Sequence, residues 1–161
     1  MIKRLFFCII LTSLFSCKSY KSIDEYIKFH HRNYMKVISD ETEIIAFPKK
    51  KTNNKSIVIK VTNAKFEYRK TMDIHDYEKI KVILLSLNQK DIEIPKVINY
   101  ANGTQALVGI TDCGSNIIFI KSDTIKKEFR TCGVIREYHG KFFEATQLIL
   151  KAAKLEMKDI N

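Results

Sequence analysis

The sequence predicts an α+β fold, with three helices packed on an antiparallel sheet of about five to seven strands. Short β-prone runs separated by turn residues indicate strands that follow one another as antiparallel neighbours. Three longer stretches carry apolar residues at the spacing of a helix face. Gly and Pro are scarce, with 5 and 2 residues in 161, and the chain therefore has no long flexible linker.

The length and charge of the chain restrict its organisation and its partners. Residues 1–16 are predicted to be a removed leader, residues 17–21 a tether and residues 22–161 a single domain. The remaining 145 residues carry 26 Lys and Arg against 18 Asp and Glu. That excess indicates an acidic partner, or only a composition rich in Lys, Ile and Asn. No nucleic-acid motif accompanies the charge, so we do not expect nucleic-acid binding.

The first helix is expected over residues 23–38. Ser22 and Glu25 have the spacing of a capping box, and an apolar stripe follows them. His30 and His31 fall within this stretch. Adjacent side chains on a helix point about 100° apart, so solvated or half-buried histidines are favoured over a shared metal.

Strands are expected next, at residues 43–47 and 56–61, with residues 65–69 extending the sheet. Pro48 ends the first of them, and the polar, lysine-rich residues 49–55 predict a hairpin loop. The lysine triplet at 49–51 is interpreted as a solvated loop, with contact to a membrane or an acidic protein as the alternative.

A second helix is predicted over residues 74–88, with Asp73 as its N-cap. Asp73, His75 and Asp76 cluster at its start, where the helix dipole favours carboxylates. The dipole explains these residues without a metal, and a divalent-ion site is the alternative.

Three further strands are expected at residues 105–111, 116–121 and 125–131, after a turn at Asn102–Gly103. As an up-down-up meander they would bring Cys113 and Cys132 to one end of the sheet. The first and third strands lie about 9.6 Å apart, whereas a disulfide needs Cα atoms within roughly 7 Å. A Cys113–Cys132 disulfide is therefore predicted if the loops bend inward or the two strands are neighbours. A catalytic Cys113 with His139 as base is the less favoured alternative.

The last helix is predicted over residues 140–157, with its apolar residues near one face and its lysines mostly outside that stripe.

The N-terminus has the pattern of a secretory signal peptide. Lys3 and Arg4 precede an apolar run that extends to Phe15. This run of roughly 12 residues is too short to span a bilayer, which needs about 20.

The residues Leu14-Phe15-Ser16-Cys17 resemble the lipobox of bacterial lipoproteins. The resemblance implies that Cys17 receives a diacylglyceryl group and further acylation, typically palmitate, and that a peptidase recognising Leu14 and Ser16 cuts before it. An ordinary signal peptide with an incidental cysteine is the alternative, and Cys8 is a poor rival because Phe7 precedes it. Lys18, rather than Asp, follows Cys17, which in the enterobacterial pathway implies the periplasmic face of the outer membrane.

Function is predicted from this address and from the lack of a catalytic motif in the sequence. No nucleophile elbow, zinc-protease motif, dinucleotide fingerprint or P-loop occurs, and no cofactor or metal is predicted. We expect a non-enzymatic envelope lipoprotein that binds membrane lipid through acylated Cys17 and also a protein partner, for instance as an inhibitor or immunity protein. A small envelope hydrolase with a site built from dispersed residues is the alternative.

Overall fold

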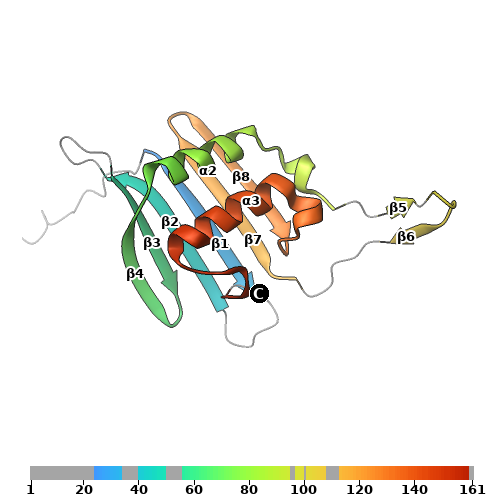
Figure 1. Cartoon of the computed structure of the whole chain (residues 1–161), viewed down its shortest axis with the longest axis horizontal. Helices are drawn as coiled ribbons and strands as arrows, with labels where there is room; N and C mark the ends of the chain where they lie inside the picture. Colours follow the sequence, from blue (N-terminus) through green and yellow to red (C-terminus); the bar gives the residue numbers. More distant parts are fainter. Residues whose placement is uncertain are drawn as a thin grey trace, which may run out of the picture.

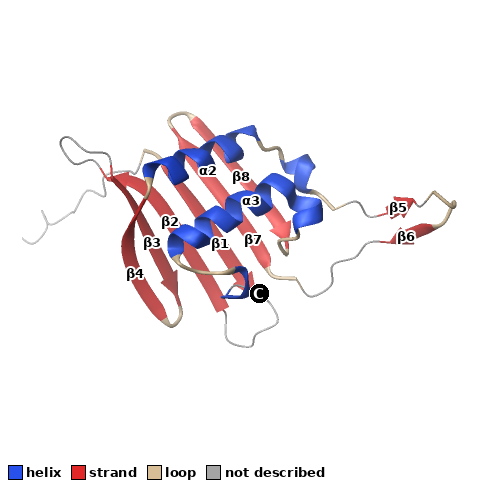
Figure 2. Ribbon diagram, in the orientation of Figure 1, coloured by secondary structure: helices blue, strands red, loops and turns tan. Residues whose placement is uncertain are grey.

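The computed structural model describes residues 24–33, 40–49, 56–94, 97–99, 101–107 and 113–159. In this part of the chain one antiparallel sheet of six strands has the order β4-β3-β2-β1-β7-β8. Two helices, α2 and α3, lie across one face of the sheet, and no helix of the described residues lies on its other face (Figure 1, Figure 2). The α+β class and the size of the sheet are as predicted, but two helices pack on the sheet instead of three.

The sheet is built from a four-stranded meander and a hairpin. The strands are β1 (Tyr26–Asn33), β2 (Asp40–Lys49), β3 (Ser56–Asn63), β4 (Phe66–Met72), β7 (Ser115–Ser122) and β8 (Ile125–Cys132). β1 pairs with β2 on one side and with β7 on the other, and it thereby joins the meander to the hairpin. The predicted loop over residues 49–55 connects two antiparallel neighbours, because Lys49 pairs with Ser56.

The prediction of a helix over residues 23–38 is wrong, since its described part forms β1. Ile27, Phe29 and His31 alternate with residues that face the other side of the sheet, and all three are buried. The helical stripe and this alternation are both present in the sequence. The strand prevails because pairing on two sides satisfies its backbone and buries every second side chain. The proposed capping residue Ser22 lies outside the described residues.

Pro48 lies inside β2 instead of ending it. Residues 42, 44 and 46 of β2 direct their backbone groups to β1, and the pairing with β1 ends at Ala46–Ile27. Pro48 is the next even-numbered residue, so its backbone nitrogen also faces the β1 side, but β1 has no residue paired with it. A proline costs no ladder hydrogen bond there.

The helices α2 (Ile74–Ser86) and α3 (Arg136–Ala153) cover the buried face of the sheet. Asp73 caps α2 as predicted, because its side chain accepts from His75 N at 2.7 Å. α3 begins four residues before the predicted start, and Gly140 lies inside it with φ +32°. It ends at Ala153, and Met157 belongs to a short 3-10 turn, η2 (Met157–Asp159). No helix of the described residues is long and apolar enough to span a membrane.

The core lies between this helical layer and the sheet. Its largest fully buried side chains come from β1, β2, β3, β7 and both helices and include Phe29, Ile44, Ile59, Tyr77, Leu84, Ile118 and Phe142. The Tyr68 hydroxyl donates to the carbonyl of Ala153 and joins the outermost strand β4 to the end of α3.

The three-stranded meander predicted over residues 105–131 is wrong in its first strand. β6 (Gln105–Leu107) pairs with β5 (Val97–Asn99), and this small hairpin lies apart from the main sheet (Figure 1). The predicted turn at Asn102–Gly103 joins the two strands, with Gly103 at φ +82°. The strands expected at 116–121 and 125–131 are β7 and β8, and they form a hairpin.

Candidate functional site

Cys113 and Cys132 lie at disulfide distance, with their Cα atoms 5.3 Å apart. Cys132 ends β8 opposite Ser115 of β7, and Cys113 precedes Ser115 by two residues. The two cysteines thus lie at the open end of the β7–β8 hairpin, Cys132 at the end of β8 and Cys113 just before the start of β7. Neither geometry considered above applies, because the first expected strand is β6 of the separate hairpin and Cys113 instead lies just before β7, the direct neighbour of β8.

A row of polar side chains crosses the buried face of the sheet beside this cysteine pair. Its members occupy one register position on five strands: Asn63, Thr42, His31, Asn116 and Thr131. Asn116 Oδ1 accepts from His31 Nδ1 at 2.8 Å, and Asn63 Nδ2 donates to Thr42 Oγ1 at 2.8 Å. His31 is only 4% exposed. These mutual hydrogen bonds give the row a structural role, since buried polar groups need partners.

His139 does not offer a free base to Cys113. Its ring is 1% exposed, and Nδ1 accepts from the backbone N–H of Ile135 at 2.9 Å. Burial lowers the pKa of this imidazole, which favours its neutral form. The hydrogen bond therefore fixes Nε2 as the protonated nitrogen, and Cys113 has Cys132 as its neighbour.

The other residues considered as metal ligands do not form a shared site either. His30 and His31 point to opposite faces of β1, and His30 lies 3.8 Å from Glu41 on the face opposite α2 and α3. Asp73 is engaged as the N-cap of α2. Among the described residues no three His, Cys, Asp or Glu side chains form a group that could hold a metal ion.

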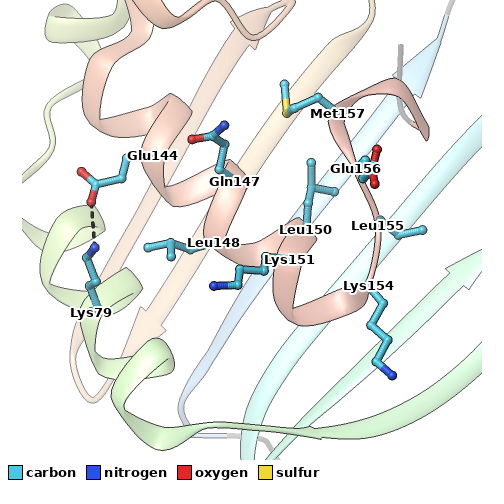
Figure 3. A pocket seen from close by; sticks show the side chains of 10 residues that line it. All are labelled: Lys79, Glu144, Gln147, Leu148, Leu150, Lys151, Lys154, Leu155, Glu156 and Met157. Carbon is cyan, nitrogen blue, oxygen red and sulfur yellow. Dashed lines mark ion pairs between the residues drawn. The ribbon is translucent and has the colours of Figure 1, made fainter.

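A groove of about 790 Å³ runs over the outer surface of the helical layer (Figure 3). Leu148 and Lys151 extend from α3 toward α2, where Lys79 pairs with Glu144 at 3.1 Å. Leu155 and Met157 line it on the C-terminal segment. Its lining of leucines and lysines contains no histidine, and Glu144 is neutralised by its ion pair.

The face of the sheet opposite α2 and α3, which no helix of the described residues covers, carries more cations than carboxylates. Its described strand residues include eight cations and four carboxylates. The cations are Lys28, Arg32, Lys49, Lys60, Arg69, Lys121, Lys126 and Arg130, and the carboxylates are Glu41, Glu43, Glu67 and Glu128. We call this set the cationic face.

Each carboxylate of the cationic face has a cation beside it. Arg32 lies 3.2 Å from Glu41, and Lys60 lies 3.1 Å from Glu67. Lys28 pairs with Glu43, and Arg130 with Glu128. The four carboxylates are thus already matched within the face, and its net charge remains positive.

Apolar side chains lie between these charges. Tyr26 stacks on Phe119 with 5.5 Å between ring centroids. The two rings border a hollow of about 310 Å³ that Ile117, His30 and Arg130 also line. An aromatic pair framed by cations is suited to contact a partner that is itself partly apolar and acidic.

Sequence reasoning identified few of these residues as functional. Lys49 was noted within the lysine triplet, and it ends β2, whereas residues 50 and 51 are outside the described part. Tyr26, Phe119 and Lys126 were not singled out, because their shared face follows from the pairing of β1 with β7 and of β7 with β8. Leu14, Ser16 and Cys17 lie outside the described residues, so the lipobox stays a prediction.

Comparison with known proteins gives this chain no relative. No family model matches it, and neither does any curated protein or solved structure.

Proposed function

We propose that this protein is a lipid-anchored binding protein of the cell envelope that holds an acidic protein partner on its cationic face. The observation that carries the proposal is the excess of cations, eight against four carboxylates, on the sheet face opposite α2 and α3, which is free of helices in the described part of the chain. An inhibitor or immunity protein that neutralises an incoming toxin is one concrete form of this function.

Charge complementarity is the physical reason for an acidic partner. Paired surface charges contribute little by themselves, but a surface with net charge of one sign raises the rate of encounter with an oppositely charged partner. Tyr26 and Phe119 supply apolar contact area in the same region, and aromatic side chains are frequent among the residues that dominate binding.

Anchoring through acylated Cys17 would place this surface at a membrane. Two or three acyl chains bind essentially permanently, since each buried CH₂ contributes about 0.8 kcal/mol. Eight residues lie between Cys17 and Tyr26 at the start of β1, and this stretch reaches about 30 Å when extended. With Lys18 after Cys17, we propose the periplasmic face of the outer membrane, so that protease added to intact cells would leave the domain uncut.

A pair of charge-matched variants tests the binding surface. K49E/K126E reverses two exposed cations of the cationic face, and K90E/K151E reverses two exposed cations elsewhere. In affinity capture from envelope extracts with full-length protein, the first variant should lose the acidic partner that wild type and the second retain. Equal capture by both variants would refute the proposal, as would binding to anionic lipid vesicles with no protein partner.

A further inference from the structure

The two outer edges of the sheet are treated differently. On β8, the side chain of Gln89 forms hydrogen bonds with both backbone polar groups of Arg130. Gln89 Nε2 donates to Arg130 O at 2.9 Å, and Arg130 N donates to Gln89 Oε1 at 3.0 Å. The amide of Gln89 thereby imitates a neighbouring strand. Lys127 of β8 also donates to the carbonyls of Leu85 and Leu87. The backbone N–H and C=O of Arg130 on this edge are therefore occupied and cannot pair with a further strand.

The edge of β4 has no such cover within the described part of the chain. Gly133 N donates to Gly114 O at 2.9 Å, so these two opposite residues form a hydrogen-bonded pair. Every second pair along the β7–β8 hairpin is then also hydrogen-bonded. The registers run without a bulge from β8 to β4 and carry the alternation across the sheet. Glu67, Arg69 and Thr71 therefore direct their N–H and C=O groups outward.

The side chains of β4 add to the exposed backbone. Phe66 is 39% exposed, although it is a large apolar residue, and its ring lies 5.7 Å from that of Tyr68. Both rings are on the helix side of the strand. Glu67 and Arg69 are on the cationic face, two residues apart and opposite in charge.

We propose that β4 pairs with β4 of a second copy of this chain, antiparallel, about a two-fold axis that passes beside Tyr68. In this register Glu67 of each copy faces Arg69 of the other, so two opposite-charge pairs form on the cationic face. Tyr68 faces its own counterpart on the helix side, and Phe66 faces Lys70, a cation that can lie against its ring.

The backbone favours this register over its neighbours. Centred on Tyr68, the outward groups of Glu67 and Arg69 fall in hydrogen-bonded pairs, and Tyr68 falls in the non-bonded position where side chains approach closely. Centring on Arg69 or on Glu67 would place identical charges opposite each other. Centring on Lys70 would place Glu67 opposite Asp73.

The dimer goes beyond the proposed function and does not depend on it. An isologous interface of this kind uses one patch twice, and its axis is perpendicular to the sheet. Both cationic faces therefore lie on the same side of a continuous sheet of twelve strands, six from each copy.

Charge reversal with rescue tests the dimer in full-length lipidated protein, in detergent, by sedimentation. E67R and R69E should each weaken dimerisation roughly 30-fold, because each substitution turns two attractive pairs into repulsive ones. E67R/R69E should restore it. The matched control is E128R and R130E on the opposite edge of the sheet, where the same charges occur on β8, and both should dimerise like wild type.

A cysteine scan in membranes tests the register. Y68C should form an interchain disulfide, since non-bonded pairs bring Cα atoms to about 4.5 Å, whereas F66C should not. A monomeric wild type at every concentration without Y68C cross-links would overturn the proposal. Equal cross-linking by F66C, a strand of another protein captured at β4, or failure of E67R/R69E to rescue would overturn it as well.

Discussion

Removing the cysteine pair as C113S/C132S should destabilise the protein through its unfolded state. A Cys113–Cys132 bridge spans 19 positions and closes a loop of about 20 residues. In the chain-entropy model such a loop restricts the unfolded chain by about 11 cal/mol/K, or about 3 kcal/mol at 25 °C. The native hairpin end keeps its own hydrogen bonds, from Gly133 N to Gly114 O and from Thr131 Oγ1 to Gly133 O. Little native structure should therefore be lost.

The expected shift in melting temperature follows from the size of the domain. Unfolding entropy near 60 °C is about 2.1 cal/mol/K per residue, or about 0.3 kcal/mol/K for this domain. A loss of about 3 kcal/mol then lowers Tm by about 10 °C. The denaturant m-value should rise at the same time, because an uncrosslinked chain exposes more surface when it unfolds.

Urea and thermal unfolding of oxidised wild type and C113S/C132S would measure both quantities. The oxidised protein should also run faster on a non-reducing gel than on a reducing one. Two titratable thiols from these cysteines in denatured, unreduced protein would refute the bridge. An unchanged Tm with an intact bridge would instead refute the entropic reasoning.

Three further predictions concern other parts of the chain. C17A should leave an uncut precursor without fatty acid, which radioactive palmitate labelling would reveal, and label retained in this variant would contradict the lipobox. G114A should cost about 1–3 kcal/mol by overpacking, because its Cβ would lie 2.7 Å from His31 Cε1 and 3.1 Å from the Arg32 carbonyl; urea unfolding measures this loss. Burial lowers the pKa of His139 in the folded protein. The unfolded chain therefore takes up the proton first as the pH falls below the unfolded pKa of about 6.5, and the free energy of unfolding decreases by at most about 1.4 kcal/mol per pH unit. H139N keeps an acceptor for Ile135 N–H and should flatten the pH dependence of stability between pH 4 and 7, and an identical profile would contradict this cause.

Elements whose local signals agree could be predicted from the sequence. In α2 the cap at Asp73 and the stripe of Tyr77, Ile80 and Leu84 point to one structure, and these three residues are buried. The strands β3 and β8 likewise have alternating patterns bounded by turns. The cysteine pair was predicted from a three-stranded meander whose first strand lies elsewhere; the two cysteines still come together because Cys113 lies just before β7 and Cys132 ends β8.

β1 could not be predicted because its sequence supports two structures. The buried positions Ile27, Phe29 and His31 include a histidine, which is expected at the surface by its polarity. His31 is buried because it is hydrogen-bonded to Asn116. That partner is 85 residues away in the chain. Pairing of this range decides between strand and helix, and local spacing contains no information about it.

The cationic face could not be predicted for a related reason. Ile45, Phe47 and Val58 on this face are as apolar as the residues of the core face. Alternation alone therefore does not tell which side of the sheet the helices cover. The contrast between the two edges is also tertiary, because Gln89 reaches Arg130 from a turn 41 residues away.

The symmetry of the proposed dimer restricts how two lipid anchors can share one membrane. With the axis perpendicular to the sheet, the N-terminal ends of the two β1 strands point in opposite directions within the sheet plane. If Cys17 is acylated as proposed, both anchors enter one bilayer when that plane lies parallel to it. Helices and sheet pack about 10 Å apart, and a helix adds about 5 Å of radius, so a tether of about 30 Å reaches beyond the helical layer. The helical layer, with its exposed Val82 (65%), can then face the lipid, while the two cationic faces form one surface directed away from the membrane toward an acidic partner.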